Sequence, residues 1–229
     1  PTELEYQLRD SGAKAIVIFE NVAHTLEKVI KNTPVEHIIL ASMGEMHGFF
    51  KRLLLNFVVR HVKKLVPSFN IAGAITFKKA LSLGRNHELK KVNITADDLA
   101  FLQYTGGTTG VSKGAVLLHR NILSNVSQIE MWLNPGLKKA DEQLQFLCAL
   151  PMTHIFALTA CAFLGMAKGA TLILVANPRD IDGFIKLLIK HPKINIFPGV
   201  NTLFHALIHR PEFKKVKFSN LLVTIGGGM

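Results

Sequence analysis

Residues 104–115 read YTGGTTGVSKGA, and this stretch decides how the rest of the chain is interpreted. From Thr105 to Gly114 it holds four glycines, three threonines, one serine and one lysine. It separates two apolar runs, LAFLQYT (99–105) and AVLLH (115–119), each of which predicts a strand. A plain hairpin needs only one or two glycines and has no need of three threonines and a lysine. The composition therefore indicates a loop with a chemical task, and a long flexible hairpin turn is the alternative.

Glycine lets a backbone approach a ligand closely and adopt positive φ, and hydroxyls and Lys113 add donors and positive charge for phosphate oxygens. The order of residues excludes the nucleotide loop G-x-x-x-x-G-K-[ST], because Lys113 is followed by Gly114 and a strand rather than by a hydroxyl residue and a helix. It is not a dinucleotide fingerprint either. The stretch predicts a phosphate loop of another type, placed between strands.

The flanking sequence predicts an α/β fold with mainly parallel sheets flanked by helices, because continuous apolar runs alternate with helical segments. Further strands are expected at 15–19, 37–40, 144–150, 170–175, 194–200 and 221–226. Helices are expected at 2–12 with a Thr2 cap, at 23–32, after Asn121 as a cap, at 180–191 with an Asp180 cap, and at 201–210. The turn-rich stretch NPGLKKADEQ (134–143) predicts a break, and hence two lobes, 1–138 and 139–229.

The composition suits a large core in one domain or two small ones, since 48% of the 229 residues are hydrophobic. The apolar run 155–167 is too short to span a bilayer, which takes about 20 residues, so a core helix is expected there. Cys148 and Cys161 lie in apolar surroundings and predict buried, reduced thiols in a reducing cytosol. A first residue Pro1 and a last stretch IGGGM suggest a fragment.

The net charge of +11 is uneven. Residues 46–95 hold ten Lys or Arg and one acid, Glu88, a net charge of +9. Within them, GFFKRLLLNFVVRHVKKLV (48–66) forms an amphipathic helical pattern, with Arg52, Asn56, Arg60, Lys63 and Lys64 on one side and apolar residues over most of the other. Two interpretations stay open: a surface helix whose apolar face packs on its own domain, or a helix that lies in an anionic membrane interface.

The stretch YTGGTTGVSKGAVLLHRN resembles the signature [ST]-[SG]-G-[ST]-[ST]-G-x-P-K-G of the adenylate-forming enzymes, which include acyl-CoA synthetases, luciferases and adenylation domains. One departure is Ser112, which stands where proline is usual; bacterial long-chain fatty-acid–CoA ligases accept a small residue there. The segments PTELEYQLRDSGAKAIVI, LPMTHIFALT, ANPRDIDGF, PGVNTLFHAL and TIGGGM are similar to further segments of these ligases. The resemblance covers nearly the whole chain, and less than half of the full-length enzyme.

The resemblance implies parts of the two N-terminal α/β lobes of such an enzyme, and a two-step reaction. A long-chain fatty acid reacts with ATP to give acyl-adenylate and pyrophosphate, with Mg²⁺ present, and the thiol of CoA then displaces AMP. It implies that the ATP phosphates are bound by a loop made of Tyr104, Thr105, Gly106, Gly107, Thr108, Thr109, Gly110, Val111, Ser112, Lys113, Gly114 and Ala115. Thr105 would be a metal-side hydroxyl, and Lys113 would hold the β- and γ-phosphates.

The same resemblance implies an acyl site. His154 would lie at the mouth of the acyl tunnel, and Phe156 and Val200 would contact substrate. A turn made of Gly226, Gly227 and Gly228 would run past the adenine and the acyl chain. From spacing alone, His154 would be a satisfied core histidine. Thr153 replaces a usual aromatic residue. Lys113 and His154 are the expected catalytic residues. The Y-G-x-T-E segment, the ribose aspartate and the lid lysine of the family do not occur in these residues, so we expect the chain alone to be inactive.

Other patterns are less informative. His205 and His209 share a helix face, but Ala206 stands where a zinc site of the H-E-x-x-H type needs glutamate. Asp97 and Asp98 suit a solvated lead-in to a strand, and Asp180 and Asp182 a helix start.

The alternatives to a long-chain fatty-acid–CoA ligase are an acyl-AMP ligase, an aryl-CoA ligase, and a non-catalytic basic module that binds phosphate ligands or nucleic acid. The basic region lacks the aromatic interleaving of single-strand binders, so no nucleic-acid partner is expected. We expect a cytoplasmic protein, peripheral at the inner face of the membrane. Acyl chain length and oligomeric state stay open, a homodimer included.

Overall fold

The computed structural model describes residues 1–106, 110–137 and 143–227. Its contacts form two compact units, Pro1–Ile94 with Phe101–Val116, and Thr95–Ala100 with Leu117–Met229. The boundary expected between residues 138 and 139 lies outside the described residues. Helix α5, which ends just before it, contacts elements of the second unit.

The first unit is built on a three-stranded parallel sheet in the order β1 (Ala15–Phe19), β2 (His37–Ala41), β3 (Ile75–Thr76). Its helices are α1 (Thr2–Asp10), α2 (Ala23–Glu27), α3 (Phe49–Phe57) and α4 (Phe77–Gly84), with a 3₁₀ turn at Ile30–Asn32 and a π-helical turn, Val58–Val62, that continues α3. Leu8, Leu26, Val29 and Ile38 form its core. Burial of these side chains holds α1 and α2 on the sheet.

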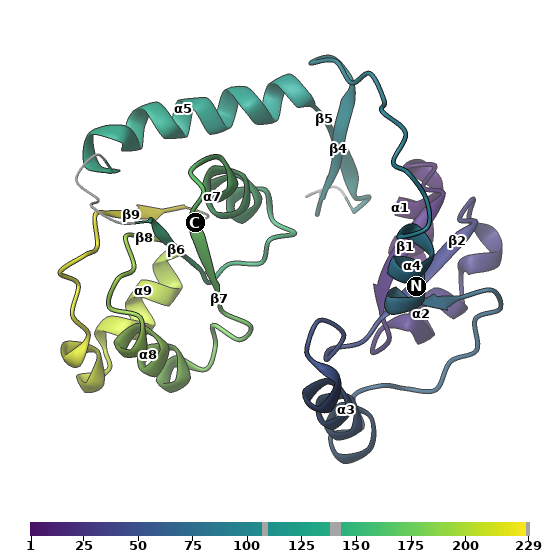
Figure 1. Ribbon diagram of the computed structural model, residues 1–229, viewed down its shortest axis with the longest axis horizontal. Coiled ribbons are helices and arrows are strands. Elements are labelled where there is room, and N and C mark those ends of the chain that lie inside the picture. The colour runs from purple at the N-terminus through teal and green to yellow at the C-terminus, as the bar shows by residue number, and fades with distance from the viewer. Residues whose placement is uncertain (107–109, 138–142, 228–229) are drawn as a thin grey trace. The chain divides into compact units, whose positions relative to one another are not determined.

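Strands β4 (Leu99–Thr105) and β5 (Lys113–Leu118) form a two-stranded sheet of their own (Figure 1). Residues 106–112 join them, which is too short for the crossover that a parallel pair needs. The pair is therefore a hairpin, and the glycine-rich stretch is its connection.

The second unit is built on a four-stranded parallel sheet in the order β7 (Thr171–Leu174), β6 (Gln145–Cys148), β8 (Ile196–Gly199), β9 (Val223–Gly226). Its helical elements are α5 (His119–Leu137), α6 (Ile155–Ala157), a π-helical turn (Leu158–Phe163), α7 (Leu164–Ala167), α8 (Ile181–Lys190), α9 (Asn201–Ile208) and a 3₁₀ turn (Pro211–Lys215).

Helices cover both faces of this second sheet (Figure 1). Leu147 of β6 packs with Phe184 and Leu207 of α8 and α9. The preceding residue, Phe146, lies on the opposite face beside Gly165 of α7. Successive side chains of a strand point to opposite faces, so a strand covered on both sides is apolar throughout. This explains why the sequence shows continuous apolar runs rather than alternation.

The sequence prediction of an α/β fold with mainly parallel sheets is confirmed, and all eight expected strands form. Strand β3 was missed because two residues carry no periodic signal. The Asp180 cap is confirmed by its acceptance of the Gly183 N–H at 3.0 Å. Cys148 and Cys161 are buried free thiols, as expected. The apolar run 155–167 is helical, and much of it is buried.

Three helix predictions were wrong in detail. Thr2 lies inside α1, whose cap position is Pro1. The segment 23–32 divides into α2 and the 3₁₀ turn. Helix α5 begins at His119, before the expected Asn121 cap, and continues through Pro135 to Leu137, into the predicted turn. Leu137 is buried and Gly136 lies against Val223, so packing holds a last turn that local propensity disfavours.

Candidate active site

The glycine-rich connection is closed at its base by one hydroxyl. Ser112 is buried, and its Oγ donates to the carbonyl oxygen of Thr105 at 3.3 Å. Gly110 has a φ of +91°, a region that side chains rarely adopt. Gly106 and Val111 are exposed. The predicted residues Gly107, Thr108 and Thr109 lie outside the described residues.

Lys113 opens β5 with an exposed side chain, and it makes no ion pair with another described residue. Its ammonium group is therefore available to a ligand. Gly114 lies against Tyr104, where an added Cβ would be 3.0 Å from the ring. Ala115 is exposed on the same strand. The glycine at 114 thus lets β5 pack closely on the tyrosine of β4.

Helix α1 supports this connection through two hydrogen bonds that span about a hundred residues. The Tyr104 hydroxyl donates to Oδ2 of Asp10 at 2.6 Å, and Gln7 Nε2 donates to Ser112 Oγ at 3.4 Å. Loss of hydration, followed by the Asp10 carboxylate, raises the pKa of Tyr104 to about 12. Sequence reasoning missed Gln7 and Asp10, because nothing in their local pattern refers to the loop.

A cavity of about 520 Å³ lies between α1 and the loop. Its lining comprises Thr2, Glu3, Tyr6, Gly106, Gly110, Val111 and Ser112. Of the nine described residues in the predicted phosphate loop, four therefore border open space large enough for several phosphate groups.

In the second unit, the predicted acyl and adenine residues follow the carboxyl ends of neighbouring strands. Gly199 of β8 pairs with Gly226 of β9, and the Gly227 N–H donates to the Gly199 carbonyl at 3.2 Å. An added Cβ at Gly227 would lie 3.1 Å from the Phe156 ring. Val200, directly after β8, holds the cap position of α9. The fold thus brings Phe156, Val200 and Gly227 to one edge of the sheet, where parallel α/β sheets bind ligands. Gly228 lies outside the described residues.

His154 follows β6 at the same edge, and its side chain is exposed rather than part of the core. Its Nδ1 accepts the Phe156 N–H at 3.3 Å at the start of α6. In the neutral imidazole this leaves Nε2 as the protonated nitrogen, able to donate. The geometry suits hydrogen bonding to an anionic group more than packing.

The described residues contain no group of three or more His, Cys, Asp or Glu side chains placed to hold a metal ion. Thr105, the expected metal-side residue, is exposed at the end of β4. His205 and His209 stack with ring centroids 4.1 Å apart, and Nδ1 of His209 lies 2.8 Å from the His205 carbonyl oxygen.

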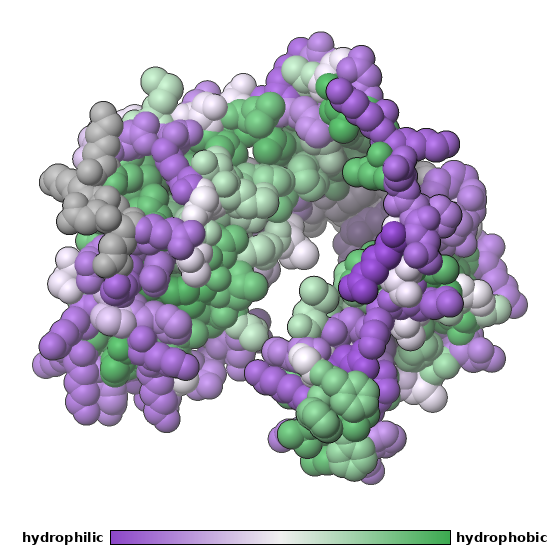
Figure 2. Space-filling view, viewed as in Figure 1, coloured by the Kyte–Doolittle hydropathy of each residue, from purple (hydrophilic) through white to green (hydrophobic). Residues whose placement is uncertain are grey.

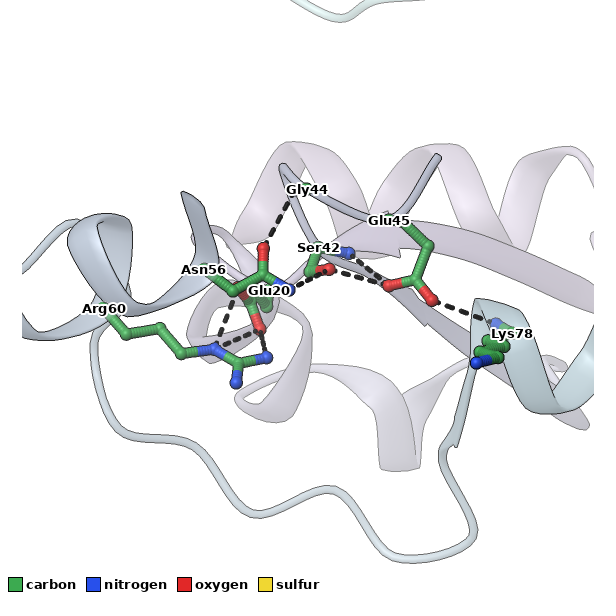
Figure 3. A network of polar contacts seen from close by, with 7 residues as sticks. All are labelled: Glu20, Ser42, Gly44, Glu45, Asn56, Arg60 and Lys78. Carbon is green, nitrogen blue, oxygen red and sulfur yellow. Dashed lines mark hydrogen bonds and ion pairs between the residues drawn. The ribbon is translucent and has the colours of Figure 1, made fainter. Parts of the chain in front are cut away.

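A surface helix usually turns its apolar side toward the protein, and α3 turns its apolar side toward solvent. Its polar side faces the protein: Arg60 pairs with the buried Glu20 at 2.6 Å, and Asn56 bonds to Ser42 and Gly44 at 2.9 Å (Figure 3). Its apolar side is open to solvent, and none of its residues is buried. Figure 2 shows hydrophobic atoms gathered over α3. The interpretation in which the apolar face packs on its own domain does not hold for the described residues.

We name this surface the α3 apolar face. It comprises Phe49, Phe50, Leu53, Leu54, Phe57, Val62 and Leu65, each at least 57% exposed. Among the parts of the chain that the structure describes, no helix combines the length and apolarity that crossing a bilayer takes.

Comparison with known proteins supports the resemblance. The AMP-binding enzyme family matches residues 1–229. The chain is 50% identical over its whole length to a long-chain-fatty-acid–CoA ligase of Haemophilus influenzae and 30% identical over 98% of it to one of Bacillus subtilis, covering 41% and 39% of those proteins. The chain therefore spans about two fifths of the length of the curated relatives it matches.

Solved structures show the same fold. The N-terminal domain of FACL13 from Mycobacterium tuberculosis has a TM-score of 0.62 at 22% identity, with 100% of this chain and 48% of that one covered. The anthranilate CoA ligase AuaEII, in complex with anthranoyl-AMP, has a TM-score of 0.71 at 18% identity, with 99% and 38% covered.

Together, the parallel sheets, the glycine-rich hairpin and the family match define a chain of the adenylate-forming class. The chain belongs to the AMP-binding enzyme family. Within that family, it is most similar, among the relatives named here, to long-chain-fatty-acid–CoA ligases.

Proposed function

We propose that the protein containing these residues activates a long-chain fatty acid in two steps. The fatty acid carboxylate attacks the α-phosphorus of ATP, and the bond to the leaving pyrophosphate breaks, which gives acyl-adenylate. The sulfur of CoA then attacks the acyl carbon and AMP leaves, which gives acyl-CoA. The observation that carries this proposal is 50% identity to a long-chain-fatty-acid–CoA ligase over all 229 residues.

Identity also favours a long-chain acyl substrate over an aryl acid. The chain is 26% identical to 4-coumarate-CoA ligase 2 of Narcissus pseudonarcissus, against 30% for the long-chain ligase of Bacillus subtilis and 48–50% for several others. A ligase for aryl acids and an acyl-AMP ligase are the alternatives that a substrate series would reveal.

The loop from Tyr104 to Ala115 would bind the ATP phosphates. The first step brings a carboxylate against a triphosphate, so positive charge must be in place before the reactants meet. Lys113 is exposed and unpaired among described residues, and Gly106 and Gly110 leave the backbone open to close approach. Lys113 would hold the β- and γ-phosphates and stabilise the charge that develops on the leaving pyrophosphate.

His154 would orient the acyl substrate. Because Nδ1 accepts a backbone N–H, Nε2 can donate to a carboxylate oxygen and hold it for attack. Phe156 and Val200 would bound the acyl group, and Gly226–Gly228 would let adenine pass close to the backbone, as the contact between Gly227 and Phe156 suggests.

Mg²⁺ would lower the charge of the triphosphate when bound. The resemblance assigns it the Thr105 hydroxyl, and the described residues contain no group of three or more His, Cys, Asp or Glu side chains beside it, so they do not make up a magnesium site by themselves. CoA would enter as co-substrate.

The test uses the full-length enzyme and replaces Lys113 with Ala. A charge-assisted hydrogen bond contributes about 1.5–3 kcal/mol, so kcat/KM for ATP should fall roughly 10- to 150-fold, with little change in KM for fatty acid. Lys217→Ala, at another exposed lysine, is the matched control and should leave both unchanged. Unchanged ATP kinetics in the Lys113 variant would refute the phosphate-loop assignment. If kcat/KM, measured by pyrophosphate release, were greater for aryl acids than for long-chain acids, the proposal of a long-chain fatty acid substrate would be refuted.

We further propose that the protein lies peripherally at the inner face of the cytoplasmic membrane, with the α3 apolar face in the interface. Residues 46–95 carry a net charge of +9, and Lys51, Lys63 and Lys64 are exposed beside that face. A bilayer with anionic lipids complements both properties. Fatty acids partition into bilayers, so this location would place the enzyme at its substrate.

Co-sedimentation of the full-length protein with vesicles tests the location. We expect binding that rises with the content of anionic lipid and falls with salt, and that Phe50→Ser with Leu54→Ser abolishes. Vesicle binding that does not change with the content of anionic lipid or with salt would refute the proposal. Binding of the double variant at the wild-type level would also refute it. Arg60 is unsuitable for such a test, because its loss leaves Glu20 buried and unpaired.

A further inference from the structure

A cavity of about 370 Å³ lies at the carboxyl edge of the three-stranded sheet. Ser42 follows β2 and Thr76 ends β3, and both line the cavity together with residues of α3. Ligands of parallel α/β sheets bind at this edge, where strand ends and helix starts leave backbone and side chains unpaired. The phosphate loop is a separate feature of the same unit, and none of its described residues lines this cavity.

Two cations in the cavity wall are free to meet an anion. Arg52 and Lys78 form no ion pair with another described residue, although Arg52 lies 5.9 Å from the centre of the Phe49 ring. Arg60 also lines the cavity, but its guanidinium is committed to Glu20. Glu45 is the one carboxylate among the lining residues that the structure describes.

Hydrogen bonds hold this wall in place (Figure 3). Glu45 accepts from the Ser42 hydroxyl at 2.7 Å and from the Lys78 backbone N–H at 3.2 Å. Asn56 joins α3 to Ser42 and Gly44. Glu45 makes these hydrogen bonds, and no ion pair between it and the Lys78 ammonium is present among the described residues, so this ammonium can meet another anion.

A second, smaller cavity of about 170 Å³ shares Glu45, Arg52 and Lys78 with the first. The rest of its lining is mainly apolar: Met46, Phe49, Phe77 and Leu81, with His47. Phe49 also belongs to the α3 apolar face. The two cations without an ion-pair partner among the described residues therefore line both cavities, and the smaller cavity shares a side chain with the α3 apolar face.

From this arrangement we propose that Arg52 and Lys78 bind the phosphate group of an anionic bilayer lipid, with an acyl chain against Phe49, Phe77 and Leu81. The inference rests on the proposed membrane location and deepens it: α3 would place its outer side chains among acyl chains while its inner side holds one headgroup. A guanidinium and an ammonium on one oxyanion give charge-assisted hydrogen bonds, which are stronger than the attraction of scattered surface charges.

The experiment compares neighbouring lysines in the full-length protein. Lys78→Gln removes a lining cation, and Lys79→Gln removes an equal, exposed charge one residue away that lines neither cavity. Partition onto phosphatidylglycerol vesicles should fall at least ~10-fold in the Lys78 variant, and no more than about fivefold, the effect of one surface charge, in the Lys79 variant. Arg52→Gln and its neighbour Lys51→Gln form a second such pair.

Soluble probes identify the ligand. A monomeric short-chain phosphatidylglycerol should bind the wild type and Lys79→Gln, and should bind Lys78→Gln at least ~10-fold more weakly. Inorganic phosphate should bind much more weakly than the lipid, because it lacks the apolar contacts. Equal binding of the two probes would reduce the cavity to a free-phosphate site and overturn the proposal.

Equal losses in the Lys78 and Lys79 variants, with wild-type vesicle binding intact, would overturn the headgroup site and leave the membrane location standing. Wild-type protein that binds no vesicles would overturn both. Circular dichroism of each variant shows that a loss of binding is not a loss of fold.

Discussion

At the residue scale, the loop depends on what each side chain permits. Gly110 allows a φ of +91°, and Gly114 lets β5 approach the Tyr104 ring. Ser112 stands where the resembling family usually has proline. Proline would stiffen the backbone, whereas the serine hydroxyl bonds across the base of the loop to Thr105. One conformational constraint is thus replaced by a hydroxyl that donates to Thr105 and accepts a second hydrogen bond from Gln7 of α1.

The Tyr104–Asp10 contact makes a prediction about titration. Raising the pKa of Tyr104 from 10.0 to about 12 favours its neutral form, so the stabilisation is present below pH 10 and is lost as the pH rises through 12. The difference in tyrosinate absorbance between the full-length protein and its Tyr104→Phe variant reports Tyr104, and this difference should rise near pH 12. Adding Asp10→Asn should move that midpoint toward 10. Identical midpoints with and without Asp10 would contradict the role given to this carboxylate.

At the element scale, two amphipathic helices differ in which side they turn toward the protein: α8 turns its apolar side inward, and α3 its polar side. Helix α8 buries Phe184, Ile185 and Leu188 against its sheet, whereas α3 buries none of its residues. Polar groups at the strand ends, Glu20 and Ser42, attract the polar side of α3 instead. A buried carboxylate needs a partner, so the ion pair with Arg60 outweighs burial of the apolar side.

The start of α8 gives a prediction about capping. Asp180 accepts the Gly183 N–H, so Asp180→Ala should lower the opening free energy of α8 by ~1 kcal/mol, within a range of about 0.5–2. Asp182→Ala removes the same charge in the same turn without removing a cap, together with an exposed 3.8 Å ion pair to Arg210 that contributes little, and it should lower this free energy less. Hydrogen exchange of the amides of residues 181–190 measures both. Equal losses would mean that charge, not the cap, stabilises this end.

At the scale of the whole molecule, each unit has a hydrophobic core of its own. Leu26 belongs to the core of the first unit and Leu207 to that of the second, and both are fully buried. Regions that share a core tend to unfold together. A substitution in one core should therefore lower the stability mainly of the unit that contains it.

Core substitutions test this expectation. Leu26→Ala and Leu207→Ala should each destabilise their own unit by about 2–5 kcal/mol, because a buried leucine leaves a cavity when truncated. Hydrogen exchange in the full-length protein should show Leu26→Ala exposing β1 and β2 while β6 and β8 keep their protection, and the reverse for Leu207→Ala. Equal loss of protection in both sheets after either change would show one cooperative body.

The sequence by itself determined most of the strands, the approximate places of the helices and the kind of loop. A strand covered on both faces must be apolar throughout, and β6 and β8 are buried along nearly their whole length. The less buried strands β1, β2, β4, β7 and β9 were also predictable from short apolar runs, as was β5 despite its shifted start. The Asp180 cap is a local hydrogen bond within three residues, and a local pattern reveals it. The glycine-rich loop was recognisable because close backbone approach and positive φ demand particular residue types.

Only the tertiary structure decided what lies beside these elements. The bonds from Asp10 and Gln7 to the loop join residues 94 and 105 positions apart, and local sequence carries no information about such pairs. The same holds for the last turn of α5, which packing against Val223 maintains, and for α3, whose amphipathic pattern is the same whichever side faces the protein. Which side is buried depended on Glu20 and Ser42, polar groups that the fold of distant strands puts within reach of Arg60 and Asn56.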